Sequence, residues 1–250
     1  ELSARFLRRL TSVPELKMRI ALWAECLEKR HPEESLAIVE FVLERNRLRD
    51  QGAIAALLGL SQLIMLNPRL IERRLMPAAI VAQADEVLRL IGDSAAERVA
   101  HEAEIRPPYL NTEREITLGE RRSWARSHDR DRLSLLLLDP DPIVIRNLLV
   151  NPKILERDVL RIASAQPSTA EVLREVYTTP RWSCRRQVQM ALVQNPYTPL
   201  DIGRPLLELM DEPALREVCS AQSIAVELRA FAQARLRRQF DGETASIALS

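Results

Sequence analysis

A helix–turn–helix step that recurs along the chain constrains its fold more than any other feature. Its clearest copy is residues 139–163, DPDPIVIRNLLVNPKILERDVLRIA, in which an Asn-Pro turn separates two short amphipathic segments. Asn caps helices, whereas Pro ends the helix before it and fits the first turn of the next one. Helix pairs of this length cannot bury their apolar faces alone, so they have to stack on neighbouring pairs.

The same turn recurs in near-register. The four copies are Leu66-Asn67-Pro68, Leu110-Asn111-Thr112, Val150-Asn151-Pro152 and Gln194-Asn195-Pro196. Their asparagines lie 44, 40 and 44 residues apart, a spacing typical of HEAT and armadillo repeats, which are roughly 40–47 residues long. Asn-Pro is also a common turn dipeptide, but the register of the four copies favours a repeat.

The composition favours helices. Glycine, which strands and phosphate loops need at tight turns, accounts for only 6 of the 250 residues, against a usual share of about 7%. The good helix formers Leu, Ala, Arg and Glu dominate. We therefore expect an all-α fold, a right-handed, HEAT-like α-solenoid of short stacked helix pairs with no sheet.

Periodicity and breakers place the helices. Among the expected helices are those at 32–49, 53–66, 142–150, 199–210 and 212–220. A more polar helix is expected at 94–105, a single helix at 182–193, and one at 223–238. Two capping-box patterns predict helix starts: Thr112 with Glu115, for a helix that runs to about Ser127, and Ser168 with Glu171.

The segment Ala53 to Leu66 is nearly all apolar. It spans 14 residues, fewer than the roughly 20 that cross a bilayer, so no membrane span is expected. We interpret it as a central helix buried on most sides, in which Gly59 permits close helix contact. The rigid step Arg106-Pro107-Pro108 suggests a boundary between an N-terminal helical part, 1–106, and a repeat part stacked on it, 107–240. Residues 241–250 are predicted to form a flexible tail.

Two segments resemble a known family. Residues 139–146, DPDPIVIR, followed by Leu148 to Pro152, are similar to the bacterial HEAT-like and leucine-rich-repeat-variant repeats, which use an Asp-Pro-Asp-x-x-Val-Arg step before an Asn-Pro turn. Residues 195–200, NPYTPL, resemble the NPxTP turn of that family. The resemblance covers 112–238 and implies an α-solenoid, but no particular partner. One member type carries an iron–sulfur cluster on a cysteine-rich segment, which this chain lacks, so no cluster is expected.

Several function classes lack their usual residues. With 36 basic and 35 acidic side chains, the chain lacks the basic excess of a general nucleic-acid binder. Cys26, Cys184 and Cys219 are widely spaced, without a Cys-x-x-Cys pair, which fits a reducing cytoplasm. Glu97 and His101 supply at most two metal ligands, and a zinc site needs three or four. We therefore expect neither a metal nor another cofactor.

Catalytic motifs are also missing. Ser123, His128 and Asp129 are the residue types of a hydrolytic triad, but no G-x-S-x-G elbow accompanies them. Neither the G-x-x-x-x-G-K-[ST] nor the G-x-G-x-x-G phosphate loop occurs. The sequence therefore predicts a protein that is not an enzyme.

Two arginine–tryptophan clusters are the candidate binding sites. The first is Arg181, Trp182, Arg185 and Arg186, and the second is Arg121, Arg122, Trp124 and Arg126. Arginine stacked on tryptophan on an exposed face would bind phosphate or a partner's carboxylate. Alternatively, Trp182 fills the core between repeats while the arginines pair with acids or solvent. In the clearest repeat copy, the prolines, the asparagine and the leucines specify helix ends and stacking. Arg146, Arg157 and Arg161 therefore remain as candidates for function.

Two function hypotheses follow. The first is a cytoplasmic, non-catalytic scaffold that binds a protein partner of unknown identity on its repeat surface. The alternative is a HEAT-like protein that binds the nucleic-acid backbone, with DNA-glycosylase-like base chemistry at most. The candidates for that alternative are Trp124, Trp182, Arg185 and Arg186.

Overall fold

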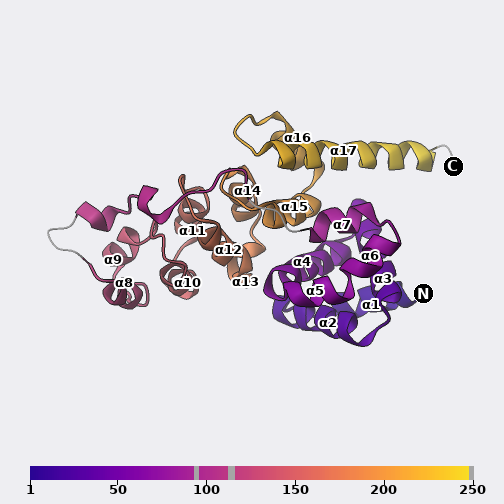
Figure 1. Cartoon of the computed structure of the whole chain (residues 1–250), viewed down its shortest axis with the longest axis horizontal. Helices are drawn as coiled ribbons and strands as arrows, with labels where there is room; N and C mark the ends of the chain where they lie inside the picture. The colour runs from indigo at the N-terminus through magenta and orange to yellow at the C-terminus, as the bar shows by residue number, and fades with distance from the viewer. Residues whose placement is uncertain (93–95, 112–115, 248–250) are drawn as a thin grey trace. The chain divides into compact units, whose positions relative to one another are not determined.

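The computed structural model describes residues 1–92, 96–111 and 116–247. Its regular secondary structure within these ranges is all helical, with no strand (Figure 1). The predicted all-α class is therefore confirmed. The first seven helices are α1 (Leu2–Thr11), α2 (Leu16–Lys29), α3 (Pro32–Arg47), α4 (Gln51–Leu66), α5 (Pro68–Arg74), α6 (Met76–Val81) and α7 (Asp85–Ile91). Two short 3-10 helices follow, η1 (Glu102–Glu104) and η2 (Pro108–Asn111).

Ten further helices complete the described chain. They are α8 (Leu118–Trp124), α9 (Arg130–Leu135), α10 (Pro142–Val150), α11 (Glu156–Ala163), α12 (Ala170–Thr178), α13 (Pro180–Ser183), α14 (Arg186–Gln194), α15 (Leu200–Leu209), α16 (Glu212–Ser220) and α17 (Val226–Ile247). Within this described part, no single helix is both long and apolar enough to cross a membrane. The helices α4 and α5 reach that length and hydropathy only together, and they meet at a bend of 102°.

The chain divides into two compact units. The first unit combines 1–94 with 203–221 and 226–250, and the second combines 95–202 with 222–225. The sequence suggested a boundary at 106/107, but the structure assigns 95–106 to the second unit, where the Arg98 amide donates to the Pro196 carbonyl. It also assigns α16 and α17, expected in the repeat part, to the first unit. The division runs through α15.

Helix α4 is the centre of the first unit, as its apolar sequence predicted. Ten of its residues are buried, and its N-terminus is capped by Asp50, whose side chain accepts from two backbone amides. A Cβ on Gly59 would lie 3.2 Å from the Arg19 Cβ, so glycine lets α2 and α4 approach closely. On the same side, the Trp23 indole donates to the Ala56 carbonyl at 2.8 Å and meets the Phe6 ring edge-on.

The second unit contains two copies of one asparagine-centred turn. The Asn151 amide donates to the carbonyls of Ala125 and Ser127, at 2.9 and 2.8 Å. The Asn195 amide donates to those of Ala163 and Ala165, at 2.8 and 2.9 Å. In both copies the asparagine Oδ1 accepts from the backbone amide two residues later. Asn151 and Asn195 therefore hold the same position in successive copies.

The predicted copy at Asn67 does not extend this pattern. Asn67 is exposed, and its side chain caps α5 by accepting from the Leu70 amide. Its role there is a local N-cap of the following helix. The side chain of Asn111 lies outside the described residues.

Several predicted helix boundaries differ from the structure. In the described part of the helix expected at 94–105, only η1 is helical and 96–101 is irregular, with Val99 exposed. The capping box expected at Thr112 and Glu115 lies outside the described residues. The next described helix, α8, starts at a capping box of Thr117 and Glu120. The cap of α12 is Thr169 rather than Ser168.

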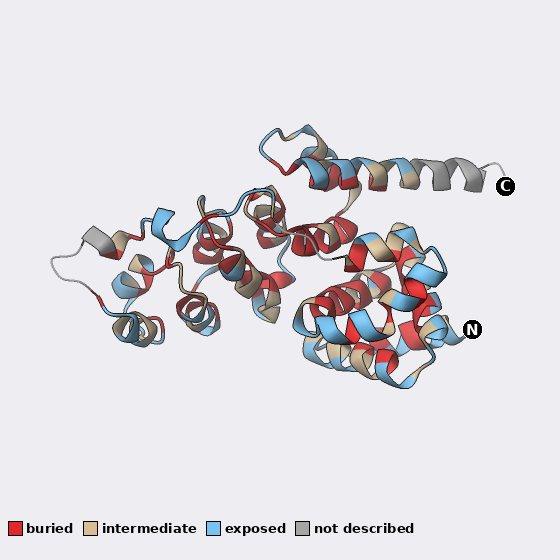
Figure 2. Cartoon of the chain, viewed as in Figure 1, coloured by how far each residue is buried: buried red, intermediate tan, exposed pale blue. Residues whose placement is uncertain are grey.

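Two more differences lie toward the C-terminal part. The single helix predicted at 182–193 is two helices, α13 and α14, because the chain turns at Cys184 and Arg185. The residues predicted as a flexible tail are helical as far as Ile247. Figure 2 shows how burial varies along the described chain: α15 is buried except at Arg204, whereas much of α5 and α6 is exposed.

Candidate functional site

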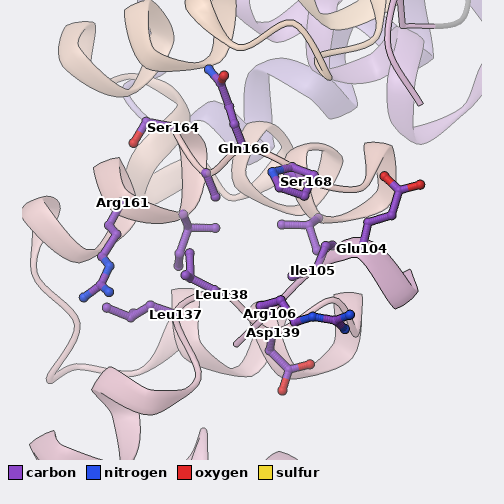
Figure 3. A pocket seen from close by; sticks show the side chains of 14 residues that line it. Glu104, Ile105, Arg106, Leu137, Leu138, Asp139, Arg161, Ser164, Gln166 and Ser168 are labelled. Carbon is purple, nitrogen blue, oxygen red and sulfur yellow. The ribbon is translucent and has the colours of Figure 1, made fainter. Parts of the chain in front are cut away.

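A cavity of about 370 Å³ opens in the second unit (Figure 3). Its lining comes from the segment around η1, the turn after α9, the end of α11, and the turn before α12 with the first residues of that helix. The floor is aliphatic: Ile105, Leu137, Leu138, Ile162 and Val172. The polar lining residues are Glu104, Arg106, Asp139, Arg161, Ser164, Gln166 and Ser168. An apolar floor with a few polar groups around it is the usual make-up of a ligand pocket.

Local structure fixes the two arginines of the rim. Arg161 lies in the last turn of α11 and is exposed, while the next residues, Ile162 and Ala163, face the core. Arg106 follows η1, and its guanidinium donates to the Ala103 carbonyl at 2.9 Å. Figure 3 shows the two guanidinium groups on opposite sides of the aliphatic floor. Within the described residues, neither arginine forms an ion pair.

Those two arginines contrast with others in the same unit. Arg130 pairs with Asp158, Arg146 with Glu175 and Arg174 with Asp201, across 28, 29 and 27 residues of sequence. The first pair connects α9 with α11, the second α10 with α12, and the third α12 with α15. Hydrogen bonds from Arg130 and the Leu155 amide, with the positive charge of Arg130, outweigh the effect of burial and hold the pKa of Asp158 below its usual range.

One wall of the pocket is a buried polar cluster. The Asp139 side chain is fully buried and accepts from Arg121 Nη1 at 2.7 and 2.8 Å and from the Asp141 amide at 2.9 Å. Arg121 also contacts the Tyr109 hydroxyl at 2.6 Å. Burial, with the nearby Asp139 charge, raises the pKa of Tyr109 to about 12, so its hydroxyl stays protonated. The Asp139 carboxylate is engaged by Arg121 and the Asp141 amide. The cluster therefore shapes the pocket wall rather than providing a free general base.

The first predicted site is divided between core and surface. Trp182 is only 3% exposed, and its indole donates to the Leu149 carbonyl at 2.8 Å. Arg181 stacks on the Trp182 ring at 4.4 Å and donates to the carbonyls of Asn151 and Ile154. Arg185 lies 4.0 Å from Glu156, and Arg186 is exposed at the start of α14. The tryptophan thus belongs to the packing between helices, and of the cluster's arginines it is Arg181 that stacks on it.

The second predicted site is also largely occupied by internal contacts. Arg121 belongs to the pocket wall, and Arg122 pairs with Asp141 at 3.1 Å. Trp124 is half-buried beneath the Arg132 guanidinium, which lies 5.1 Å from the ring centre. Arg126 is exposed. Within the described residues, its side chain forms no ion pair.

Residues that suggested other chemistry remain apart. His31, His101 and His128 are exposed, and no group of three or more metal-ligating side chains gathers in the part of the chain that the structure describes. Burial raises the pKa of the Cys26 thiol to about 11. Burial also raises the pKa of Cys219.

Sequence reasoning did not find the pocket. Its lining is spread over 104–172, and no local motif joins these segments. Two signals pointed toward it separately: the rigid Arg106-Pro107-Pro108 step and the leftover Arg161. Comparison of the chain with family models, curated proteins and solved structures gives no significant match.

Proposed function

We propose that the chain is a HEAT-like α-solenoid whose second unit is a non-catalytic module for binding another protein. The repeat is supported by the equivalent hydrogen bonds of Asn151 and Asn195, which are 44 residues apart in the sequence. It is also supported by the ion pairs between residues about 28 positions apart. Stacked repeats of this kind build extended surfaces suited to partners.

The observation that carries the binding function is the pocket. It combines an aliphatic floor, which gains from covering by another apolar group, with two exposed arginines that have no ion pair among the described residues. Its buried carboxylate, Asp139, has its oxygens engaged by Arg121 and the Asp141 amide. Such an arrangement supports recognition rather than proton transfer.

The nucleic-acid alternative has less support. A base-stacking site needs exposed aromatic faces. Of its two tryptophans, Trp182 is buried with its indole N–H bonded to Leu149, and Trp124 is covered on one face by Arg132. If this alternative holds, duplex DNA should bind at low salt and dissociate steeply as salt rises.

Affinity capture tests the proposal. The full chain, a pocket-filled variant (Ala165→Trp) and a control (Arg126→Gln) would be incubated with native lysate, after thermal melts show that all three are folded. Ala165 lines the pocket, whereas Arg126 is exposed and outside its lining. We expect a defined protein to be retained by the wild type and the control and lost with the filled pocket. Equal retention by all three would contradict the proposal.

A further inference from the structure

We infer that the pocket binds an extended acidic segment of another protein, with an aliphatic side chain on the floor between two carboxylates that reach Arg106 and Arg161. This inference rests on the proposed function and names the chemistry of the partner. The positions of the two arginines on either side of the floor set the order of the segment: acidic, aliphatic, acidic (Figure 3).

The size and floor of the pocket select the central side chain. At about 370 Å³, the cavity is near the lower end of the roughly 300–1,000 Å³ of ligand pockets. It therefore accommodates one or two side chains of an extended segment rather than a helix. The floor residues Leu137, Ile162 and Val172 are aliphatic and mostly buried, so a branched aliphatic group matches their shape and polarity.

The charges at the rim select the flanking groups. Guanidinium groups bind carboxylates through paired, charge-assisted hydrogen bonds. In this unit, arginines such as Arg130 and Arg174 already have a carboxylate partner, whereas Arg106 and Arg161 are exposed at the pocket without one among the described residues. A partner's carboxylates would complete the same type of pair that the unit uses internally.

The same lining disfavours a phosphate backbone. The floor is aliphatic, whereas single-stranded nucleic acids are bound by stacking on aromatic rings. A peptide can place an aliphatic side chain on this floor, which the phosphate backbone of a nucleic acid cannot.

Selection from a display library of random twelve-residue peptides on the immobilised full chain tests the inference. We expect the enriched peptides to share an aliphatic residue flanked by Asp or Glu. Synthetic peptides of the enriched sequence, measured by fluorescence anisotropy, should bind about tenfold or more weakly to each of Arg106→Gln and Arg161→Gln, because each loses a charge-assisted hydrogen bond. The matched control, Arg126→Gln, should bind as the wild type does.

A charge swap sharpens the test. The Arg161→Glu variant should lose the acidic peptide and recover binding when one of the two acids in the peptide is replaced by Lys. Both arginines are exposed, so melting temperatures should be unchanged, and loss of binding then reports the contact itself.

The contrary outcomes are distinguishable. If the enriched peptides lack acidic residues yet lose binding in Ala165→Trp, the acidic-segment inference is overturned while the protein-binding function stands. Should peptide binding be insensitive to Ala165→Trp, both are overturned. Displacement of the peptide by a single-stranded oligonucleotide at physiological salt would overturn the inference in favour of a nucleic-acid ligand.

Discussion

At the scale of single residues, the most demanding feature is a buried ion pair in the first unit. Arg235 has no exposed surface and Glu208 is 2% exposed, and Arg235 Nε donates to Glu208 Oε2 at 2.8 Å. Burial raises the pKa of Glu208, although the positive charges of Arg235 and Arg238 oppose it. Arg238 also pairs with Glu86. Breaking a buried pair costs more than its formation gains, because the remaining charge stays without a partner.

Replacing Glu208 by Gln should therefore destabilise the protein by about 3–5 kcal/mol. The double variant Glu208→Leu with Arg235→Met should recover much of that loss, because it removes both charges and keeps the volume. Urea denaturation measures both effects. The control is Glu212→Gln, which breaks the exposed pair with Arg216 and should change stability little. A double variant as unstable as the single one would show that the pair itself, rather than the isolated charge, is what matters.

The Arg130–Asp158 pair predicts a response to acid. Because the pKa of Asp158 is lowered in the folded state, its contribution to stability is complete above its unfolded pKa of about 3.9 and is lost as pH falls through the folded value. The stability difference between wild type and Asp158→Asn should be largest at pH 7 and shrink toward pH 3. Urea midpoints along that pH series measure it. A difference that does not change with pH would contradict the ion-pair explanation.

At the scale of elements, the asparagine turn shows how one residue type takes two roles. Asn151 and Asn195 each donate hydrogen bonds to two carbonyls at the end of an earlier helix. Asn67 instead caps the helix that follows it, α5. The Asn-Pro pattern is the same at all three positions, yet the roles differ. The dipeptide determines only the local turn. Whether an earlier helix end lies within reach depends on packing.

Substituting each asparagine by Ala separates these roles. We expect Asn151→Ala and Asn195→Ala each to cost about 2–4 kcal/mol, because buried carbonyls lose their donor. Asn67→Ala should cost about 1 kcal/mol, the usual effect of removing an N-cap. Thermal or urea unfolding of the three variants provides the comparison. Equal costs at the three positions would refute the assignment of Asn151 and Asn195 as cross-linking residues.

Some elements were predictable to the residue and others were not. The bounds of α10 and α16 match the predicted 142–150 and 212–220, because a capping Asp and a first-turn Pro mark each start. In the stretch 96–105, Ala96, Val99, Ala100 and Ala103 stand at helical spacing, so the sequence alone favoured a helix that tertiary packing does not stabilise. The pocket was not predictable, because its floor joins residues of separate segments that only tertiary packing brings together.

At the scale of the whole molecule, the first unit is discontinuous in sequence. The Asn46 side chain in α3 donates to the Glu208 carbonyl at 2.7 Å, and Arg49 donates to the Met210 carbonyl at 2.9 Å. The residues 95–202 of the second unit lie between these partners in the sequence. The stability of the first unit therefore depends on the segments 203–221 and 226–238.

Removing residues 226–250 should consequently destabilise the first unit, because Glu208 would stay without Arg235. Hydrogen exchange in α3 and α15 should increase, and the melting temperature should fall. A truncation after Arg238 retains Arg235 and Arg238 and serves as the control, with stability close to that of the full chain. Unchanged exchange in the shorter fragment would mean that α17 contributes little to this unit.

The discontinuity also has a consequence for biosynthesis. Asn46 and its partner at Glu208 are 162 residues apart, an interval that a ribosome takes roughly 8–30 s to translate at about 5–20 residues per second. During that time α3 has emerged, but its C-terminal hydrogen-bond partner does not yet exist. The Asn46 amide, which is buried in the folded unit, therefore has no Glu208 carbonyl to donate to for seconds, and the first unit is completed only after the second unit has been synthesised.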